Sequence, residues 1–343
     1  MATQDLVKSL TALCQDDTTE VDKDEFLESG SIVFDAVLSN GKGFPRRKFI
    51  QLSSESGCGK STMALHICKT LCANGYITFY LDSEKAVNDT QIESFGLKDY
   101  LNKSFFHRQI STFEEAEEIL DSILIPDDRF ALIVIDSITN LFPEKVLEKS
   151  IAEIEPGLQA RYMSLFLPKY KAKLKNSGCP ASFLFINQMR NKINFMRGST
   201  YEAAGGSAQK FNMDIRLLMT LKTKLKKMVS TITGREETPY GAINTIYSEK
   251  NRYNRPFVKA EIAIYFGKGI SNISYYSTFL INEGYVKAHK MGMYDVQLPS
   301  MKEMVKVRGQ VKLSALVRDN LDEVKQLFNA KGGVKLVVDE DEA

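Results

Sequence analysis

A segment of small and hydroxyl-bearing residues, Leu52 to Thr62 (LSSESGCGKST), contains the residue types that bind nucleotide phosphates. A lysine followed by serine supplies a cation for phosphate oxygens and a hydroxyl for Mg²⁺. The usual loop pattern has glycine six residues before the lysine, and this chain has Ser54 there. That position mainly turns the chain, so its change removes no phosphate ligand. The segment predicts a nucleotide site if a strand precedes it and a helix follows.

The predicted loop would bind phosphate through backbone N–H groups at the start of the following helix. Lys60 would neutralise the β- and γ-phosphates, and the hydroxyl of Ser61 would ligate Mg²⁺. The residues expected to bind ATP and Mg²⁺ are Gly57, Cys58, Gly59, Lys60, Ser61, Thr62 and Asp136.

Two carboxylates at the ends of other apolar runs complete this chemistry. Asp136 ends the run 130–136 (FALIVID) and would be the second metal ligand, through water. Glu84 follows the run 76–82 (YITFYLD) and would polarise the water that attacks the γ-phosphorus. A single acidic residue at or after the end of a strand is common and is usually solvated. Asp136 and Glu84 together with Lys60 predict an ATP-hydrolysing site.

The elements that must position these residues alternate along the chain from about residue 29. Short apolar runs rich in Ile, Val and Phe alternate with helical segments, and this alternation predicts an α/β fold with a mostly parallel central sheet flanked by helices. Ligands of such sheets bind at the carboxyl ends of the strands. Strand-like runs after Asn212 predict hairpins that extend the sheet. The expected strands are 48–52, 76–82, 130–136 and 182–187, and the expected helices are 61–73, 113–123 and 157–175.

Composition sets few limits on function. The 343 residues carry a net charge of +2 and are 43% hydrophobic, so any nucleic-acid surface must be local. No apolar run approaches the roughly 18 residues of a membrane span, and the first residues lack a basic and apolar leader. We therefore expect no membrane partner and a cytoplasmic protein, bacterial or in the host cytoplasm if phage-encoded. The five cysteines lack metal-ligand spacing and are expected to fill the core.

The order of these segments resembles the RecA family of recombinases, including phage UvsX-type members. The resemblance covers roughly residues 29 to 285 and implies a RecA-like P-loop ATPase core. It also implies a short N-terminal helix and a small C-terminal domain. Beyond the phosphate loop it is carried by residues 30–52, 81–86 (LDSEKA), 134–143 (VIDSITNLFP), 157–164 (GLQARYMS), 183–193 (FLFINQMRNKI) and 205–211 (GGSAQKF).

The expected domains follow from this resemblance and from the patterning. Residues 1–28, with leucines at helical spacing, would be a helix and linker for polymerisation between protomers. Residues 29–270 would be the ATPase core, and residues 271–343 a small domain with an acidic tail. That tail is either a solvated end or a competitor with DNA for basic surfaces.

The resemblance implies further roles at the site. Gln188 would sense the γ-phosphate, whereas Lys250 and Arg252 would reach the γ-phosphate of the neighbouring subunit. Where the family stacks a tyrosine on adenine this chain has Gln91, which predicts looser base binding. The predicted catalytic residues are Glu84, Lys60, Gln188, Lys250 and Arg252, and the predicted protomer contacts are Leu6, Leu10 and Phe211.

Two segments are expected to bind DNA. The long loop 189–206 mixes cations that could follow phosphates with apolar side chains, including Phe195, that could separate bases. A first loop at about 149–156 is acidic and ends in Pro156, which argues against base insertion there. The run 222–227 (KTKLKK) is either a solvated hairpin or a guide for a second duplex. The predicted DNA-binding residues are Arg161, Arg190, Lys192, Ile193, Met196, Arg197, Gly205, Gly206 and Ser207.

These features together predict an ATP-dependent homologous-recombination protein. It would form helical filaments on single-stranded DNA, pair that strand with homologous duplex DNA and exchange strands, with DNA-stimulated ATP hydrolysis at subunit interfaces. A loader or a single-strand-binding protein is a possible further partner. The alternatives are a non-catalytic RecA-like mediator, favoured by Ser54 and Gln91, and a hexameric helicase motor with the same core.

Overall fold

The computed structural model describes residues 25–147, 157–194, 198–203, 207–231, 234–334 and 337–338. Several sequence predictions fall outside the described residues. These are the N-terminal helix with Leu6 and Leu10, the first DNA loop at 149–156, the terminal acidic run at 339–342, and Phe195, Met196, Arg197, Gly205 and Gly206.

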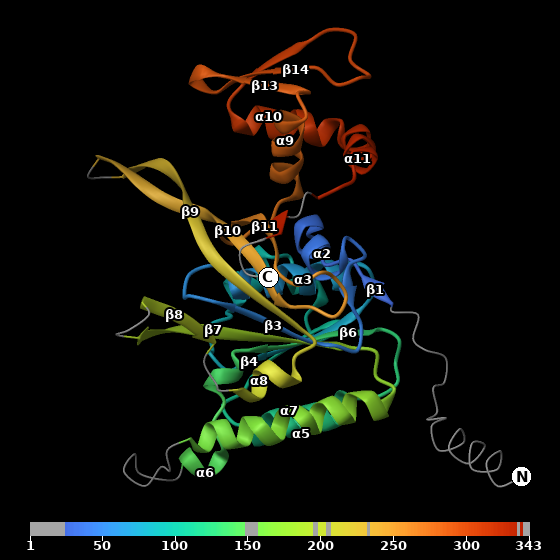
Figure 1. The fold of residues 1–343 in the computed structure, drawn as a ribbon, viewed down its shortest axis with the longest axis vertical. Coiled ribbons are helices and arrows are strands. Elements are labelled where there is room, and N and C mark those ends of the chain that lie inside the picture. The colour runs from blue at the N-terminus through green and yellow to red at the C-terminus, as the bar shows by residue number, and fades with distance from the viewer. Residues whose placement is uncertain are drawn as a thin grey trace, which may run out of the picture.

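A large mixed sheet forms the body of the protein (Figure 1). Its order is β12-β11-β10-β9-β3-β7-β6-β4-β5, and the strands from β9 to β5 in this order run parallel. The sheet confirms the predicted α/β class, and the antiparallel strands β9 to β11 extend it as expected. The strands are β3 (Phe49–Ser54), β4 (Ile77–Asp82), β5 (Phe105–Gln109), β6 (Phe130–Asp136), β7 (Ser182–Asn194), β9 (Ile215–Thr231), β10 (Gly234–Lys250), β11 (Val258–Tyr265) and β12 (Gly269–Ile270).

Helices cover both faces of the sheet and bury a separate apolar cluster on each. The helices α2 (Ile32–Ser39), α3 (Lys60–Ala73) and α4 (Asp89–Ser94) contribute to one cluster. The helices α5 (Phe113–Ile123) and α7 (Leu158–Ser177) contribute to the other. Strand β6 is buried along its whole length, which explains its unbroken apolar sequence.

Two antiparallel hairpins project from the same side of the body (Figure 1). In one, β7 continues beyond the sheet and pairs with β8 (Gly198–Ala203), from Met189 opposite Ala203 to Asn194 opposite Gly198. The segment 189–206, expected as a loop, is therefore largely a two-stranded arm. The sequence of this segment gives no regular alternation of apolar and polar residues, which is why it did not predict strands. The other hairpin is β9–β10, whose strands each have 17 residues.

The chain after residue 271 packs around its own apolar cluster. This part contains α9 (Asn272–Asn282), β13 (Val286–His289), β14 (Met293–Val296), β15 (Val305–Arg308), α10 (Gln310–Asp319) and α11 (Leu321–Ala330). The helices α10 and α11 meet at Asn320. The strands β13 to β15 were not predicted, because each has only four residues and a run this short gives little pattern.

The remaining described α-helices and strands are short. They are β1 (Phe26–Leu27), β2 (Phe44–Pro45), α6 (Glu144–Leu147), α8 (Ser207–Asn212) and β16 (Val337–Val338). Among the described residues, no helix combines the length and the apolar character needed to cross a bilayer.

Candidate nucleotide site

The functional residues at the ends of four strands are brought together by the sheet order. Strands β3, β7, β6 and β4 are neighbours, although the sequence separates them widely. Ser54 pairs in register with Gln188, and Asp82 pairs with Asp136. Glu84 follows β4 at the same edge. The carboxyl edge of the sheet therefore collects the predicted phosphate loop, sensor, metal ligand and base.

The phosphate loop joins β3 to α3, as the sequence predicts. Gly57 and Gly59 have φ angles of 79° and 91°, which side-chain-bearing residues rarely adopt. A Cβ on Gly59 would also lie 3.0 Å from the side chain of Ile264 on β11. Helix α3 begins at Lys60 directly after this turn, so its first N–H groups lack partners within the helix and suit an anion.

Lys60 is held inside the loop. Its Nζ donates to the carbonyl of Ser54 at 3.2 Å, to the Ser54 hydroxyl at 3.0 Å and to the carbonyl of Glu55 at 3.0 Å. Burial lowers the pKa of Lys60, while the nearby carboxylates of Asp136 and Glu84 act in the opposite direction. The serine that replaces the usual glycine thus contributes a hydroxyl that binds the loop lysine.

Asp136 has one bonded and one unbonded carboxylate oxygen. Its Oδ2 accepts from the Ser61 hydroxyl at 2.6 Å and from the Tyr80 hydroxyl at 2.5 Å. Its Oδ1 is buried and has no hydrogen-bond partner among the described residues. Burial raises the pKa of Asp136 to about 6, and the bonds from Ser61 and Tyr80 limit the rise. A free carboxylate oxygen beside a serine hydroxyl fits Mg²⁺, which prefers oxygen ligands.

Glu84 and Gln188 are in direct contact. The Gln188 amide Nε2 donates to Oε1 of Glu84 at 2.6 Å. The backbone of Glu84 is fixed as well, because its N–H donates to the carbonyl of Asp136 at 3.2 Å. The predicted γ-phosphate sensor therefore bonds the predicted catalytic base directly.

A buried carboxylate holds the turn that carries Glu84. Asp82 accepts from the N–H groups of Ala86 and Val87 and lies 3.4 Å from Nε2 of His107. Burial raises the pKa of Asp82, but the bonds from His107, Val87 and Ala86 outweigh it and leave the pKa below its ordinary value. The turn is thereby pinned on both sides of Glu84.

Sequence reasoning missed three residues of this site. Tyr80 lies in an apolar strand and looks like a core aromatic, so nothing in its pattern reveals its bond to the metal ligand. Asp82 ends the same strand, and its acidic character at a strand end was the one available signal. His107 follows from the structure alone, because only the pairing of β5 with β4 brings it to Asp82.

Gln91 occupies a capping position on α4. Its backbone N–H donates to the side chain of Asn88, and its side-chain oxygen accepts from the Asn88 N–H, which forms a capping box. The side chain at the position predicted to stack on adenine therefore caps the start of a helix. The spacing of Asn88 and Gln91 in the sequence could have revealed this.

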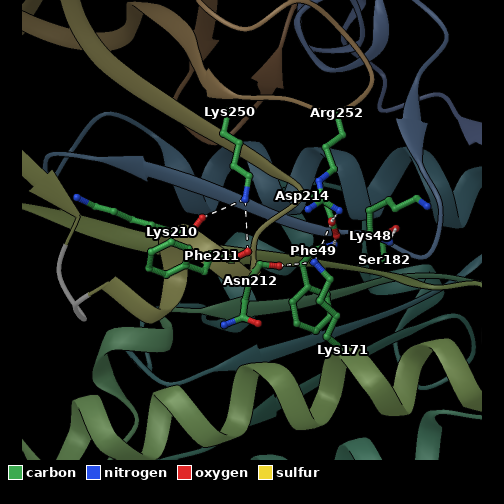
Figure 2. Close-up of polar contacts among 10 residues, drawn as sticks. All are labelled: Lys48, Phe49, Lys171, Ser182, Lys210, Phe211, Asn212, Asp214, Lys250 and Arg252. Carbon is green, nitrogen blue, oxygen red and sulfur yellow. Dashed lines mark hydrogen bonds and ion pairs between the residues drawn. The ribbon is translucent and has the colours of Figure 1, made fainter.

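The two predicted trans-acting cations bind within their own chain (Figure 2). Nζ of Lys250 donates to the carbonyls of Lys210 and Phe211, on α8, at 3.1 and 3.4 Å. Arg252 donates to Oδ1 of Asp214 at 3.1 Å. Burial and neighbouring cations, Arg252 first among them, lower the pKa of Lys250. Phe211, a predicted protomer contact, is 77% exposed beside them.

Asp214 anchors this cluster at the amino ends of the parallel strands, away from the carboxyl ends that carry the predicted nucleotide site. It accepts from Nζ of Lys171 at 2.8 Å and from the N–H of Phe49, the first residue of β3, at 3.0 Å. The phosphate loop starts at the other end of β3, roughly 20 Å away for a strand of this length. Within one chain the cluster and the phosphate loop are therefore at opposite ends of the same strand.

The predicted DNA-binding residues that are described lie on three elements, β7, α8 and α7. The backbones of Arg190, Lys192 and Ile193 belong to β7, the strand that contains Gln188. Ser207 begins α8, and Arg161 lies exposed in the first turn of α7.

Comparisons with known proteins agree with this arrangement. Residues 7–271 match the family model described as the RecA N-terminal domain. Protein RecA of Mycobacterium ulcerans is 33% identical over 265 residues, which cover 76% of this chain and 71% of that protein. Protein RecA of Mycobacteroides abscessus is 33% identical over 261 residues, with the same coverage of 76% and 71%. A RecA of a Mycobacterium species, strain KMS, is 34% identical over 265 residues and covers the same shares.

The match extends over most of the chain and includes every strand whose carboxyl end contributes to the site. It accompanies a predicted phosphate loop, a predicted metal ligand and a predicted catalytic base, which follow neighbouring strands at one edge of a mostly parallel sheet. The chain therefore belongs to the RecA family, as a RecA-type recombinase.

Proposed function

We propose that this chain polymerises on single-stranded DNA, with ATP bound between subunits, and exchanges that strand with a homologous duplex. The observation that carries the proposal is the bond between Gln188 and Glu84. Gln188 lies on the strand that continues into the β7–β8 arm, so the residue that meets the nucleotide is continuous with the predicted DNA-binding segment.

The residues of the site have distinct roles in this proposal. Lys60 and the N–H groups at the start of α3 would bind the phosphates, and Ser61 and Asp136 would hold Mg²⁺. A bound Mg²⁺ would neutralise charge on the phosphate oxygens. Glu84 would accept a proton from the attacking water.

Gln188 would couple the nucleotide to DNA. The amide Nε2 of Gln188 donates to Oε1 of Glu84 at 2.6 Å. A γ-phosphate oxygen is a strong competing acceptor, and its capture of the amide would release the Glu84 carboxylate for water. The same movement would shift the root of the β7–β8 arm, which links ATP state to DNA affinity.

Lys250 and Arg252 would act on the nucleotide of the adjoining subunit. Their position at the amino end of β3 supports this role, because they are far from the phosphate loop of their own chain. Hydrolysis would then depend on assembly, since an isolated subunit lacks these charges at its γ-phosphate.

Further partners are also proposals. The homologous duplex, a loader and a single-strand-binding protein fit a filament-forming recombinase. The likeness to phage UvsX-type members stays a prediction, and the relatives named above are bacterial RecA proteins.

The test combines ATP hydrolysis with imaging. We expect single-stranded DNA to stimulate hydrolysis and a non-hydrolysable ATP analogue to produce open helical filaments on that DNA. The variant Lys60→Ala should lose ATP hydrolysis. Absence of stimulation would instead indicate a mediator, and closed six-fold rings would indicate a helicase motor.

A further inference from the structure

Asn244 on β10 contacts the phosphate loop from outside the segments that carry the nucleotide motifs. Its side chain is fully buried, and its Nδ2 donates to the carbonyl of Cys58 at 3.0 Å. The orientation of the amide is fixed by this bond, because a carbonyl can only accept. Its Oδ1 is buried and has no hydrogen-bond partner among the described residues. A buried amide with one bond and one unmet oxygen is costly and needs a compensating role.

The bonded peptide is one of the groups expected to bind phosphate. The carbonyl of Cys58 and the N–H of Gly59 belong to one planar trans peptide and point in opposite directions. A bond from Asn244 that draws the carbonyl toward β10 therefore directs the Gly59 N–H away from β10, into the loop. Asn244 thus sets the direction of a donor in the phosphate cradle.

The restraint matters because the loop is intrinsically free to reorient at this point. Gly57 and Gly59 flank Cys58, and both adopt positive φ angles. Glycine permits peptide planes to rotate with little steric cost, so the plane between residues 58 and 59 has alternatives. Ile264, on the neighbouring strand β11, packs against Gly59 and restricts its position. An apolar contact of this kind does not determine the direction in which an N–H group points.

We infer that Asn244 is a positioning residue for nucleotide binding: it orients the Cys58–Gly59 peptide so that the loop is prepared for the phosphates of ATP. This inference rests on the proposed nucleotide function of the loop. Because Asn244 acts on the phosphate cradle alone, its loss should weaken binding of any polyphosphate, with or without a base.

The strand offers a matched control. Ser248 lies four residues further along β10, is also fully buried, and its hydroxyl has no partner among the described residues. Ser248→Ala therefore perturbs the same buried strand without removing a bond to the loop. Asn244→Leu keeps the approximate size of the side chain and removes the donor.

The experiment measures dissociation constants for ATP and for inorganic pyrophosphate, each with Mg²⁺, by calorimetry. We expect Asn244→Leu to weaken both by about tenfold, the loss typical of one hydrogen bond, and Ser248→Ala to change neither by more than about twofold. The KM for ATP should rise by the same factor, while kcat at saturating ATP is largely kept. If Asn244→Leu fails to fold, Asn244→Ser replaces it and should show the same pattern.

Two results would overturn the inference. One is wild-type affinity of the folded variant for both ligands, and the other is an equal loss in Asn244→Leu and Ser248→Ala. A wild-type chain that binds neither ATP nor pyrophosphate would overturn the proposed function itself, and this inference with it.

Discussion

Asp136 and Glu84 are carboxylates on adjacent strands whose surroundings suit them to different tasks. Asp136 is 1% exposed, bonded to two hydroxyls and left with one free oxygen, which suits a metal ligand. Glu84 is only half-buried and accepts a hydrogen bond from the Gln188 amide, for which a phosphate oxygen could compete. Sequence position could predict both carboxylates, because Asp136 ends a recognisable strand and Glu84 follows another by two residues. It could not predict Tyr80, whose role depends on its distance to Asp136.

Replacement of Glu84 tests the assignment of the base. Glu84→Gln keeps the size of the side chain but cannot accept a proton, so kcat for ATP should fall by about 100-fold or more. ATP affinity should be kept, because Glu84 makes no predicted phosphate contact. Glu93→Gln, on the exposed face of α4, is the control. Hydrolysis at the wild-type rate by Glu84→Gln would refute the assignment.

Asp35 predicts a pH dependence of stability. Burial raises the pKa of Asp35 from 3.8 to about 7, and the hydrogen bonds from Ser29 act in the opposite direction. Between about pH 4 and pH 7 the carboxyl is therefore protonated in the folded protein and ionised in the unfolded chain. The unfolding free energy of the wild type should fall as pH rises from about 4 to 7 and then level. Asp35→Asn lacks this titration and should gain up to about 4 kcal/mol over the wild type above pH 7.

Denaturant unfolding at several pH values measures this difference. Asp99→Asn, at an exposed position, should show no pH-dependent change relative to the wild type. A constant difference between Asp35→Asn and the wild type from pH 4 to 8 would contradict the prediction.

Among the elements, the buried strands were the most predictable and the projecting ones the least. β6 is covered on both faces, so its composition alone indicates a central parallel strand. The sequence of the arm of β7 and β8 lacks the alternation of apolar and polar residues that marks a strand. Its location beside the nucleotide edge was predictable, because it continues from the strand of Gln188.

The arm can be tested through the salt dependence of DNA binding. Arg190→Ala with Lys192→Ala should weaken single-stranded DNA binding and reduce the slope of log affinity against log salt by about 1.4, or about 0.7 for each phosphate that the variant no longer neutralises. ATP affinity without DNA should not change. Lys98→Ala with Lys103→Ala, on an exposed surface near α4, is the control pair. An unchanged slope in the arm variant would exclude phosphate binding by these two side chains.

At the scale of the whole molecule, the nucleotide loop and the cluster of Lys250 and Arg252 occupy opposite ends of one strand. An assembly that stacks subunits head to tail would bring the cluster of one chain to the loop of the next. No pattern within a single chain reveals this geometry. The sequence could suggest it only through the family resemblance, and the distance along β3 supplies the physical reason.

Complementation tests this arrangement. Lys250→Ala and Lys60→Ala chains should each show little DNA-stimulated ATPase. A random equal mixture should regain about a quarter of wild-type activity, because one interface in four joins an intact lysine cluster to an intact loop. Lys250 is preferred to Arg252 for this test, because Arg252 also neutralises the buried Asp214. No recovery on mixing would contradict action between subunits.

The continuity of strand β7 bears on the relative timing of phosphate release and DNA release. Between Ser182 and Asn194 it contains neither glycine nor proline, so no flexible joint separates Gln188 from the arm. A displacement of the sensor is thus a displacement of the arm, without an intervening relaxation. In a stopped-flow experiment, loosening of DNA and release of phosphate should share one rate constant, with no lag between the two signals.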